Sequence, residues 1–562
     1  MKQIISYFNT ILQLYPEEKL SKKIVMIIIL LILGSGLEFL NLSLIIPFLN
    51  KMTATSASLP LGSPYLNLIT ERTLLELLSI ILLVNTLKNS IQFLSLYFQN
   101  ALSYRLESRL SQTLLAKDMQ QDFEAQKRKN TAESQNEILN VSFNINRYFI
   151  LPFMGIVSDF IVLSTILIFL FLFNPQITFL SLLLFSVAIV FYNFSIGKRY
   201  MKWGKVKLKT NQERLKIIQE SLGAIVDITL LRKHSFFQQK FEQENSISER
   251  VGTYQNAFNQ FPKFYFEFLV YLFLWVIIFY INTYGNASGD LILTLGVFAA
   301  SLMKIIPSFN KLAAAYQSIK YSLPSLRHIE ALTPKRNTFS AEEQKPITFT
   351  QKIAFENVDF KYQTGTKYVF KNFSFQLTKN TSLGIVGESG KGKSTLINLL
   401  LGLLNPQAGA ITTDGQNISQ NLKQWQSMIG YVPQSIYLLE TTLRENIAFG
   451  LDEEKIDNIR LKEVIRDAQL DSFIQQPEEL YRPVGERGLD LSGGQVQRIG
   501  IARALYHNPE ILIFDEATSA LDGSTEEEVL KTIKQLSKTK TIIMISHKRE
   551  NLDFCNNIIT LS

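Results

Sequence analysis

The stretch that decides the fold is Gly387-Glu388-Ser389-Gly390-Lys391-Gly392-Lys393-Ser394. It has the spacing G-x-x-x-x-G-K-[ST], in which backbone N–H groups of a glycine-rich loop surround the phosphates of a nucleotide. The apolar run before it, 382–386, predicts a strand, and the residues after it, 395–404, predict a helix. Because the N-terminus of a helix attracts anions, this strand, loop and helix together predict a nucleotide site.

Two residues of this stretch carry the expected chemistry. Lys393 would reach the β- and γ-phosphate oxygens of ATP, and the hydroxyl of Ser394 would bind Mg²⁺. Their neighbours would surround the phosphates, so the predicted cofactor-binding set at this loop is Gly387, Glu388, Ser389, Gly390, Lys391, Gly392, Lys393, Ser394 and Thr395.

The composition indicates an apolar part joined to a soluble part. The chain has 562 residues, too many for one hydrophobic core, and it is 46% hydrophobic while still 19% charged. Its single cysteine, Cys555, excludes an intramolecular disulfide framework and a metal site made of cysteines alone. The net charge of +8 would suit either nucleic acid or the cytoplasmic loops of a membrane protein.

Six apolar segments in the first 335 residues predict helices that span a bilayer. They lie at 24–49, 74–104, 148–173, 177–196, 264–281 and 291–306. Lysines and arginines are concentrated at 105–147 and 197–263, which the positive-inside rule places in the cytoplasm together with both termini. Acidic residues alternate with these basic ones, which indicates a solvated helix face and no nucleic-acid partner.

These patterns predict the domains. We expect a transmembrane domain at 1–335, a linker at 336–350 and a soluble domain at 351–562. The predicted fold class is an α-helical transmembrane domain of six helices followed by an α/β P-loop nucleotide-binding domain. The protein would be a multi-pass protein of the cell inner (plasma) membrane, with its nucleotide-binding domain in the cytoplasm.

Charged side chains inside the predicted spans allow two interpretations. One is mutual pairing between helices, and the other is a water-filled cavity that binds an acidic group, since an isolated charge in hydrocarbon is costly. The residues concerned are Lys88, Lys263, Lys304, Glu38, Asp159 and Glu267.

The soluble half carries further candidates for ATP chemistry. The apolar strand 511–514 leads into Asp515, which would hold Mg²⁺ through water, and Glu516, which would polarise the attacking water. Gln434 would complete the Mg²⁺ shell, and His547, after the apolar strand 541–545, would reach the γ-phosphate. The ring of Tyr362 could stack on a purine.

A second anion site is predicted at Ser492, Gly493, Gly494 and Gln495, which open a helix. One nucleotide does not need two such sites from one domain. This loop would therefore complete the ATP site of a second subunit.

Together these motifs resemble those of the ABC transporter family. The matches are the P-loop, Gln434 of the Q-loop, the signature 491–495, Asp515-Glu516 of the Walker B motif, the D-loop 519–522 with Asp522, and the switch His547. The resemblance implies an exporter-type half-transporter that works as a homodimer with ATP and Mg²⁺. It also implies short coupling helices near 119–124 and 222–228 that dock on nucleotide-binding domains.

The membrane half resembles one subfamily, the bacterial flippases of lipid-linked oligosaccharides. In that subfamily three arginines line the cavity, and this chain has Lys88, Lys263 and Lys304 in their place. The resemblance implies that these lysines hold the pyrophosphate of a polyprenyl-linked glycan. Two other functions stay open: an exporter of peptides or of amphipathic drugs or lipids, and a non-transport ATP-gated membrane protein.

Overall fold

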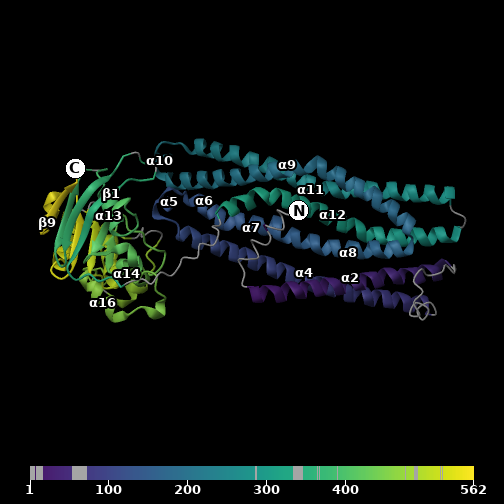
Figure 1. Ribbon diagram of the computed structural model, residues 1–562, viewed down its shortest axis with the longest axis horizontal. Helices are drawn as coiled ribbons and strands as arrows, with labels where there is room; N and C mark the ends of the chain where they lie inside the picture. Colours follow the sequence, from purple (N-terminus) through teal and green to yellow (C-terminus); the bar gives the residue numbers. More distant parts are fainter. Residues whose placement is uncertain are drawn as a thin grey trace. The chain divides into compact units, whose positions relative to one another are not determined.

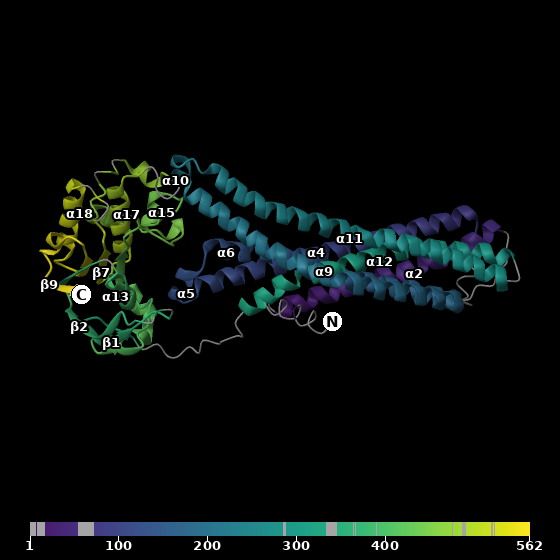
Figure 2. The ribbon, with the colours of Figure 1, turned by 90° about the horizontal axis from the view of Figure 1, so that it is seen from above.

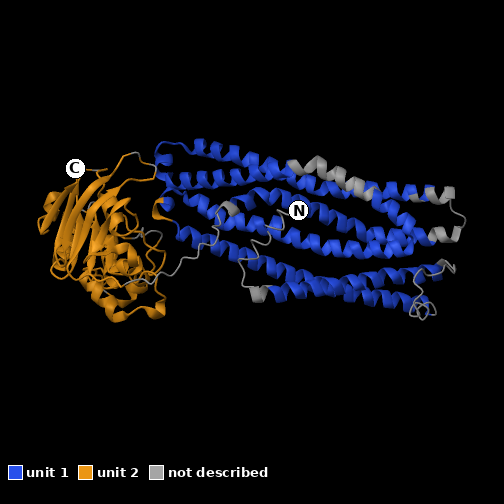
Figure 3. Cartoon of the chain, viewed as in Figure 1, with its two compact units in different colours: residues 1–121, 125–337 blue, residues 122–124, 338–562 orange. Residues whose placement is uncertain are grey.

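The computed structural model describes residues 7, 17–53, 72–284, 288–332, 346–363, 365, 367–388, 390–471, 473–474, 476–485, 491–518, 521 and 523–561. Side chains are described for all of these except 17–20, 53, 184–198, 277, 280–284, 288–292 and 329–332. The chain forms two compact units, shown in Figure 3: residues 1–121 with 125–337, and residues 122–124 with 338–562. Residues 336–345 of the predicted linker 336–350 lie outside the described residues.

The first unit is built from long helices that pack along one another (Figures 1 and 2). α2 packs on α4, α8 packs on α12, and α9 packs on both α11 and α12. These helices are α2 (Glu17–Thr53), α4 (Leu74–Met119), α8 (Leu151–Phe173), α9 (Pro175–Gly223), α11 (His234–Tyr284) and α12 (Ser288–Leu332). At about 1.5 Å per residue, the helices of 45 residues or more reach well beyond a bilayer.

Shorter elements connect the long helices. Between α4 and α8 the chain forms α5 (Phe123–Arg128), α6 (Thr131–Gln135), the π-helical η1 (Asn136–Val141), α7 (Ser142–Ile145) and the π-helical η2 (Asn146–Ile150). Between α9 and α11 it forms α10 (Ile225–Leu230). The predicted coupling segments fall on 119–124 and on the end of α9 with most of α10.

A single residue, Asn174, separates α8 from α9. Its backbone is extended, its side chain accepts a hydrogen bond from the N–H of Ile177, and Pro175 occupies the first turn of α9. Both features favour a helix start, because the side chain replaces a missing backbone partner and proline has no N–H to satisfy. The predicted tight connection at 174–176 is therefore even shorter than expected.

The exposed surface of the first unit carries many large apolar side chains. Examples on three different helices are Leu82, Phe160 and Trp275. A water-soluble protein would bury such residues, whereas a helix in lipid exposes them. Among the described residues, four helices are long and apolar enough to cross a membrane: Ser21–Met52, Leu74–Met119, Thr131–Phe173 and Leu293–His328. The other two predicted spans fall on α9 and α11, where part of the side chains lies outside the described residues.

The second unit contains a parallel and an antiparallel sheet. The parallel sheet has the order β6-β7-β8-β3-β9, and the antiparallel sheet has the order β2-β1-β4-β5. The parallel strands are β3 (Ser382–Gly387), β6 (Ile429–Val432), β7 (Ile511–Asp515), β8 (Thr541–Ile545) and β9 (Asn557–Leu561). The antiparallel strands are β1 (Lys352–Phe360), β2 (Phe370–Thr378), β4 (Ala408–Thr413) and β5 (Gln416–Asn417).

Helices complete this unit. They are α13 (Lys393–Leu400), α14 (Leu422–Ser427), α15 (Leu443–Ile447), α16 (Asn458–Asp467), α17 (Gly493–Tyr506) and α18 (Gly523–Leu536). The central strands β7 and β8 are buried almost throughout, which explains why their sequences are continuous apolar runs without alternation.

The register of the parallel sheet brings three distant segments to one edge. Ile545 of β8 pairs with Ile385 of β3 on one side and with Asp515 of β7 on the other. The P-loop, Glu516 and His547 follow these three strands, so all of them leave the sheet at its carboxyl end. Open α/β sheets bind their ligands at this edge.

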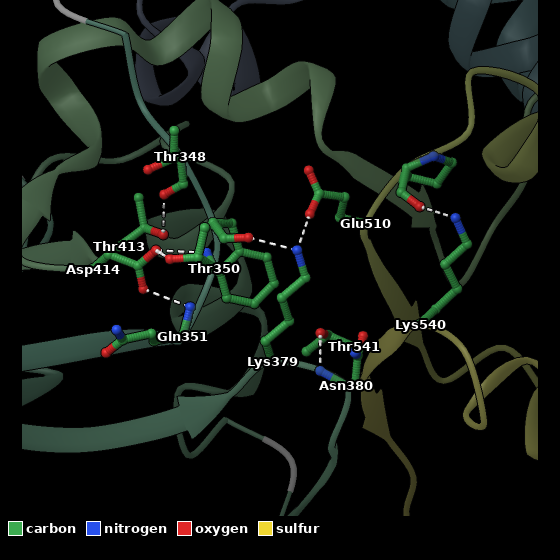
Figure 4. A network of polar contacts seen from close by, with 12 residues as sticks. Thr348, Thr350, Gln351, Lys379, Asn380, Thr413, Asp414, Glu510, Lys540 and Thr541 are labelled. Carbon is green, nitrogen blue, oxygen red and sulfur yellow. Dashed lines mark hydrogen bonds and ion pairs between the residues drawn. The ribbon is translucent and has the colours of Figure 1, made fainter.

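The carboxylate of Asp414 forms hydrogen bonds with residues 350–352, where the antiparallel sheet begins (Figure 4). Asp414, in the turn between β4 and β5, accepts hydrogen bonds from the backbone N–H groups of Thr350, Gln351 and Lys352 and from the Thr350 hydroxyl. These donors outweigh the effect of partial burial and lower the pKa of Asp414 to about 2.

Residues 122–124 belong to the second unit although they lie between α4 and α8 in the sequence. Phe123 packs against the hydrophobic cluster that also contains Phe355 and Trp425. The carboxylate of Glu124 accepts a hydrogen bond of 3.0 Å from the N–H of Gln363.

Candidate nucleotide site and membrane site

The P-loop joins β3 to α13 with the backbone geometry that an anion cradle requires. Gly390 and Gly392 have φ angles of 82° and 92°, a region that residues with a side chain rarely adopt. A Cβ at Gly392 would also lie 2.8 Å from Cγ1 of Val369, so the loop depends on glycine there. Ser389 lies outside the described residues, and Lys391 is exposed.

The side chain of Lys393 lies at the centre of the site. It is 7% exposed, and its ammonium group donates a hydrogen bond of 2.8 Å to the carbonyl of Gly387. The Nζ atom also lies 3.4 Å from Oε1 of Glu516 and 3.2 Å from Nδ1 of His547. A buried cation in this position suits a polyphosphate, since such a charge is costly unless an anion pairs with it.

Glu516 links the other predicted catalytic residues. Its Oε1 atom lies 2.7 Å from Nε2 of His547, and its Oε2 atom accepts a hydrogen bond of 2.8 Å from the side-chain amide of Gln434. Its φ angle of 51° is unusual for a residue with a side chain and is held by a hydrogen bond from its N–H to the carbonyl of Ile545. Backbone strain of this kind costs about 1–3 kcal/mol and concentrates at functional sites.

The surroundings of Asp515 disfavour a lone negative charge. Burial and the neighbouring carboxylate of Glu516 raise the pKa of Asp515, while a hydrogen bond from the hydroxyl of Tyr431 at 3.2 Å opposes the shift. Two adjacent carboxylates at one strand end are the usual setting for a divalent cation. Ser394, Gln434 and Asp515 offer only oxygen ligands, as Mg²⁺ prefers, so this part of the site fits the ion.

Tyr362 lies against the first turn of α13. Its hydroxyl is 2.9 Å from Oγ1 of the buried Thr395, and its ring packs edge-on against Phe360. Thr395 thus helps to hold the ring beside the phosphate loop, which is compatible with the predicted contact to a purine.

The second predicted anion site lies at the start of α17. Ser492 caps the helix by accepting a hydrogen bond from the N–H of Gln495, whose side chain in turn accepts from the N–H of Ser492. Gly494 approaches α18 so closely that a Cβ there would lie 2.4 Å from Thr525. Asp522 lies outside the described residues, as do 486–490 before the signature.

The first unit holds a cluster of charges at the predicted membrane depth. Glu38 of α2, only 3% exposed, pairs with Lys88 of α4 at 3.0 Å and also with Lys304 of α12. Lys263, on α11, is exposed and forms no ion pair among the described residues. The structure therefore brings two of the three predicted substrate lysines together through a carboxylate.

Comparison with protein families identifies both halves of the chain. The family model for the ABC transporter transmembrane region matches residues 24–306, half of the chain, and the ABC transporter model matches residues 370–519. The chain belongs to the ABC transporter family. This membership also makes it an ATPase coupled to transport, as the motifs predicted.

Several known ABC transporters are similar over different lengths of this chain. A putative export ATP-binding/permease protein of Rickettsia bellii is 27% identical, with 94% of this chain and 93% of the relative covered. An ATP-dependent lipid A-core flippase of Cupriavidus metallidurans is 28% identical over 72% of this chain and 69% of the relative. A mitochondrial iron-sulfur clusters transporter of Danio rerio is 35% identical, but the chain covers only 37% of its length.

The fold of this ABC transporter is that of a known exporter. A bacterial Atm1-family ABC exporter, solved with ATP bound, superposes with a TM-score of 0.80 and covers 97% of this chain and 94% of the known one. At 21% identity this likeness concerns the fold alone. It supports the predicted order of a helical transmembrane domain followed by an α/β nucleotide-binding domain, in an exporter-type half-transporter.

Some contacts of this ABC transporter had no signal in its sequence. The hydrogen bond from Tyr431 to Asp515 joins two neighbouring strands, and the left-handed backbone of Glu516 follows a run that predicts only an extended strand. The convergence of Lys88 and Lys304 on Glu38 depends on how three helices pack. The ion pairs themselves agree with the pairing between helices that was one of the two interpretations of these charges.

Proposed function

We propose that this ABC transporter is an ATP-driven flippase that moves a lipid-linked oligosaccharide across the inner membrane. Two copies of the chain would form the working transporter, with the nucleotide-binding domains in the cytoplasm and with ATP and Mg²⁺ at two shared sites. The polar head of a polyprenyl-pyrophosphate glycan would cross through the helical domain while its lipid tail stays in the bilayer.

The observation that carries this proposal is the charge of the membrane cluster. Two lysines share the single carboxylate of Glu38, so the cluster keeps an excess positive charge. Charges at membrane depth usually mark a substrate path, because burying them without a function costs stability. A pyrophosphate would supply the missing negative charge. We propose Lys263 of α11, which is exposed, as a further cation for the substrate.

The arrangement of the nucleotide site supports turnover. We propose that Glu516 acts as the base for the attacking water, with Gln434 and His547 holding that water and the γ-phosphate in place. Lys393 would neutralise the transferred phosphate, and Tyr362 would stack on the adenine. Ser492, Gly493, Gly494 and Gln495 of the second copy, with its Asp522, would close the site.

The test measures flipping of a glycolipid in proteoliposomes. Lys88→Ala combined with Lys304→Ala should abolish flipping, because the pyrophosphate loses both paired cations, while basal ATPase activity survives. Glu516→Gln, as a reference, should reduce both ATPase activity and flipping about 100-fold or more. Unchanged flipping in the double lysine variant would reject the substrate role of these residues.

Two controls separate loss of substrate binding from loss of folding. Removing both lysines leaves Glu38 buried without a partner, which can cost about 3–5 kcal/mol. The neutral variant Glu38→Gln, Lys88→Gln, Lys304→Gln removes all three charges together and should fold but not flip. Lys88→Arg with Lys304→Arg should keep flipping, since arginine binds phosphate through two hydrogen bonds.

The remaining alternative is an exporter of peptides or amphipathic drugs. The ATPase activity of a flippase should rise with the lipid-linked glycan and not with such compounds. Stimulation by a drug or peptide alone would favour the alternative.

A further inference from the structure

Three metal-ligating side chains converge away from the sites described so far. Glu133 of α6 and Glu137 of η1 stand one helical turn apart, and His328 comes from the end of α12. One ligand atom of each residue lies within 4.8 Å of a ligand atom of both others. All three lie outside the predicted membrane spans, on the extensions of the helices.

Glu137 is the centre of this cluster. It is only 3% exposed, and each of its carboxylate oxygens has a partner. Oε1 lies 2.6 Å from Nε2 of His328, and Oε2 accepts a hydrogen bond of 2.6 Å from Lys129. Lys129 also donates to Asp118 of α4 at 2.7 Å. The side of Glu137 that faces His328 is therefore separate from the side that faces the lysine.

Lysines neutralise only part of this cluster. Lys129 pairs with Asp118 and Glu137, and the charge of Lys117 acts on the same two carboxylates. Glu133 forms no ion pair among the described residues, although its carboxylate lies close to that of Glu137. A divalent metal ion would neutralise Glu133 and Glu137 on the side that faces His328.

We propose that Glu133, Glu137 and His328 bind a divalent transition metal of the zinc class. One imidazole nitrogen and two carboxylate oxygens are a ligand set that Zn²⁺ accepts, whereas Mg²⁺ and Ca²⁺ prefer oxygen alone. Two ligand atoms of a tetrahedral zinc ion lie about 3.3 Å apart. Binding would therefore widen the 2.6 Å contact between Glu137 and His328, and small side-chain rotations would draw in the ligand atoms that lie up to 4.8 Å apart. Water would occupy the fourth position, which His328, 28% exposed, leaves accessible.

Lys129 fits this site as a supporting residue. Ligating carboxylates are commonly held by a hydrogen bond to their second oxygen, which is the contact that Lys129 makes with Glu137. The bound ion would join α6 and η1 to the last turns of α12. η1 is a π-helical turn, a form often found at functional sites.

The experiment uses the full chain in nanodiscs, purified without a histidine tag and stripped with a chelator. Zinc chloride alone is added, and the bound metal per chain and the melting temperature are measured. One zinc ion per chain and a rise in melting temperature of about 4 °C or more are expected. Replacing zinc with Co²⁺ should give the visible absorption bands of a low-coordinate site with a nitrogen ligand.

Glu133→Gln is the decisive variant, because it removes a metal ligand without removing an ion pair. Its metal-free melting temperature should match the wild type, and the zinc-induced rise should disappear. His328→Gln should also abolish zinc binding, whereas His507→Gln, at an exposed histidine of the nucleotide-binding unit, should not. A zinc response that survives both Glu133→Gln and His328→Gln, or no zinc response in the wild type, would overturn the proposal.

Discussion

The lowered pKa of Asp414 predicts how the stability of the chain depends on pH. Its pKa of about 2 lies below the ordinary value of 3.8, so folding favours the ionised form. The stabilisation is complete above about pH 4 and is lost as the pH falls towards 2. Asp414→Asn should therefore lower the melting temperature of the full chain by a few degrees at pH 7, and the difference from wild type should shrink below pH 4.

Asp452→Asn is the matched control for this prediction. Asp452 is 75% exposed, and its one ion pair within the described part of the chain is with Lys455, one turn along the chain. Exposed pairs of this kind contribute little, so its melting temperature should follow the wild type at every pH. An effect of Asp414→Asn that did not depend on pH would contradict the role of the charge.

At the scale of single residues, the sequence predicts the role of a side chain where the residues of a site are contiguous in the chain. Roles could be predicted for Lys393 and Ser394 because the whole phosphate loop occupies one stretch, and for Glu516 because it follows an apolar strand. The contact between Glu137 and His328 spans 191 residues and follows from the packing of two helices. No local sequence pattern encodes such a contact. Glu137 and His328 were therefore not among the metal-binding residues predicted from the sequence.

At the scale of elements, Gly392 decides the shape of the phosphate loop. Gly392→Ala would force a side chain into a left-handed backbone and against Val369. We expect nucleotide binding to weaken at least about 10-fold, which fluorescence titration with a labelled ATP analogue would measure. Gly252 lies within α11, and a Cβ added there would meet no other atom within 4 Å, so Gly252→Ala should bind nucleotide normally and melt slightly higher.

Elements were predictable where one physical cause dominated. Continuous apolar runs predicted the bounds of β8, 541–545, as the structure has them. The predicted bounds of β3 and β7 differ from the observed ones by at most one residue. The helix after the phosphate loop was expected at 395–404 but spans 393–400, because it starts inside the loop itself. Apolar residues at i, i+3 and i+4 in the basic segment 197–263 predict that α9 and α11 continue beyond the bilayer as helices, and the structure confirms this, with lengths of 49 and 51 residues. Their bounds were not predicted, because the two helices also stabilise each other by packing.

At the scale of the whole molecule, the shared ATP site can be tested by mixing two inactive chains. One carries Lys393→Ala in the phosphate loop, and the other carries Gly493→Asp at the start of α17. In a dimer with shared sites, the mixed pair keeps one site with both parts intact. Co-expression with two different tags and purification of the mixed dimer should therefore restore a clear share of the wild-type ATPase activity.

Each chain alone should be inactive in the same assay. If every ATP site used the phosphate loop and the α17 terminus of one chain, the mixed dimer would be as inactive as its parents. That outcome would reject the homodimer with shared sites, while leaving the family of the chain unaffected.

The ion cluster on Glu38 restricts how three helices can move. The carboxylate of Glu38 on α2 pairs with one lysine of α4 and one lysine of α12. Sliding one of these helices past the others would break an ion pair of the buried Glu38, at a cost of about 3–5 kcal/mol when no other cation replaces the lysine. The three helices should consequently travel as one rigid block, with the hinge of the transport cycle elsewhere.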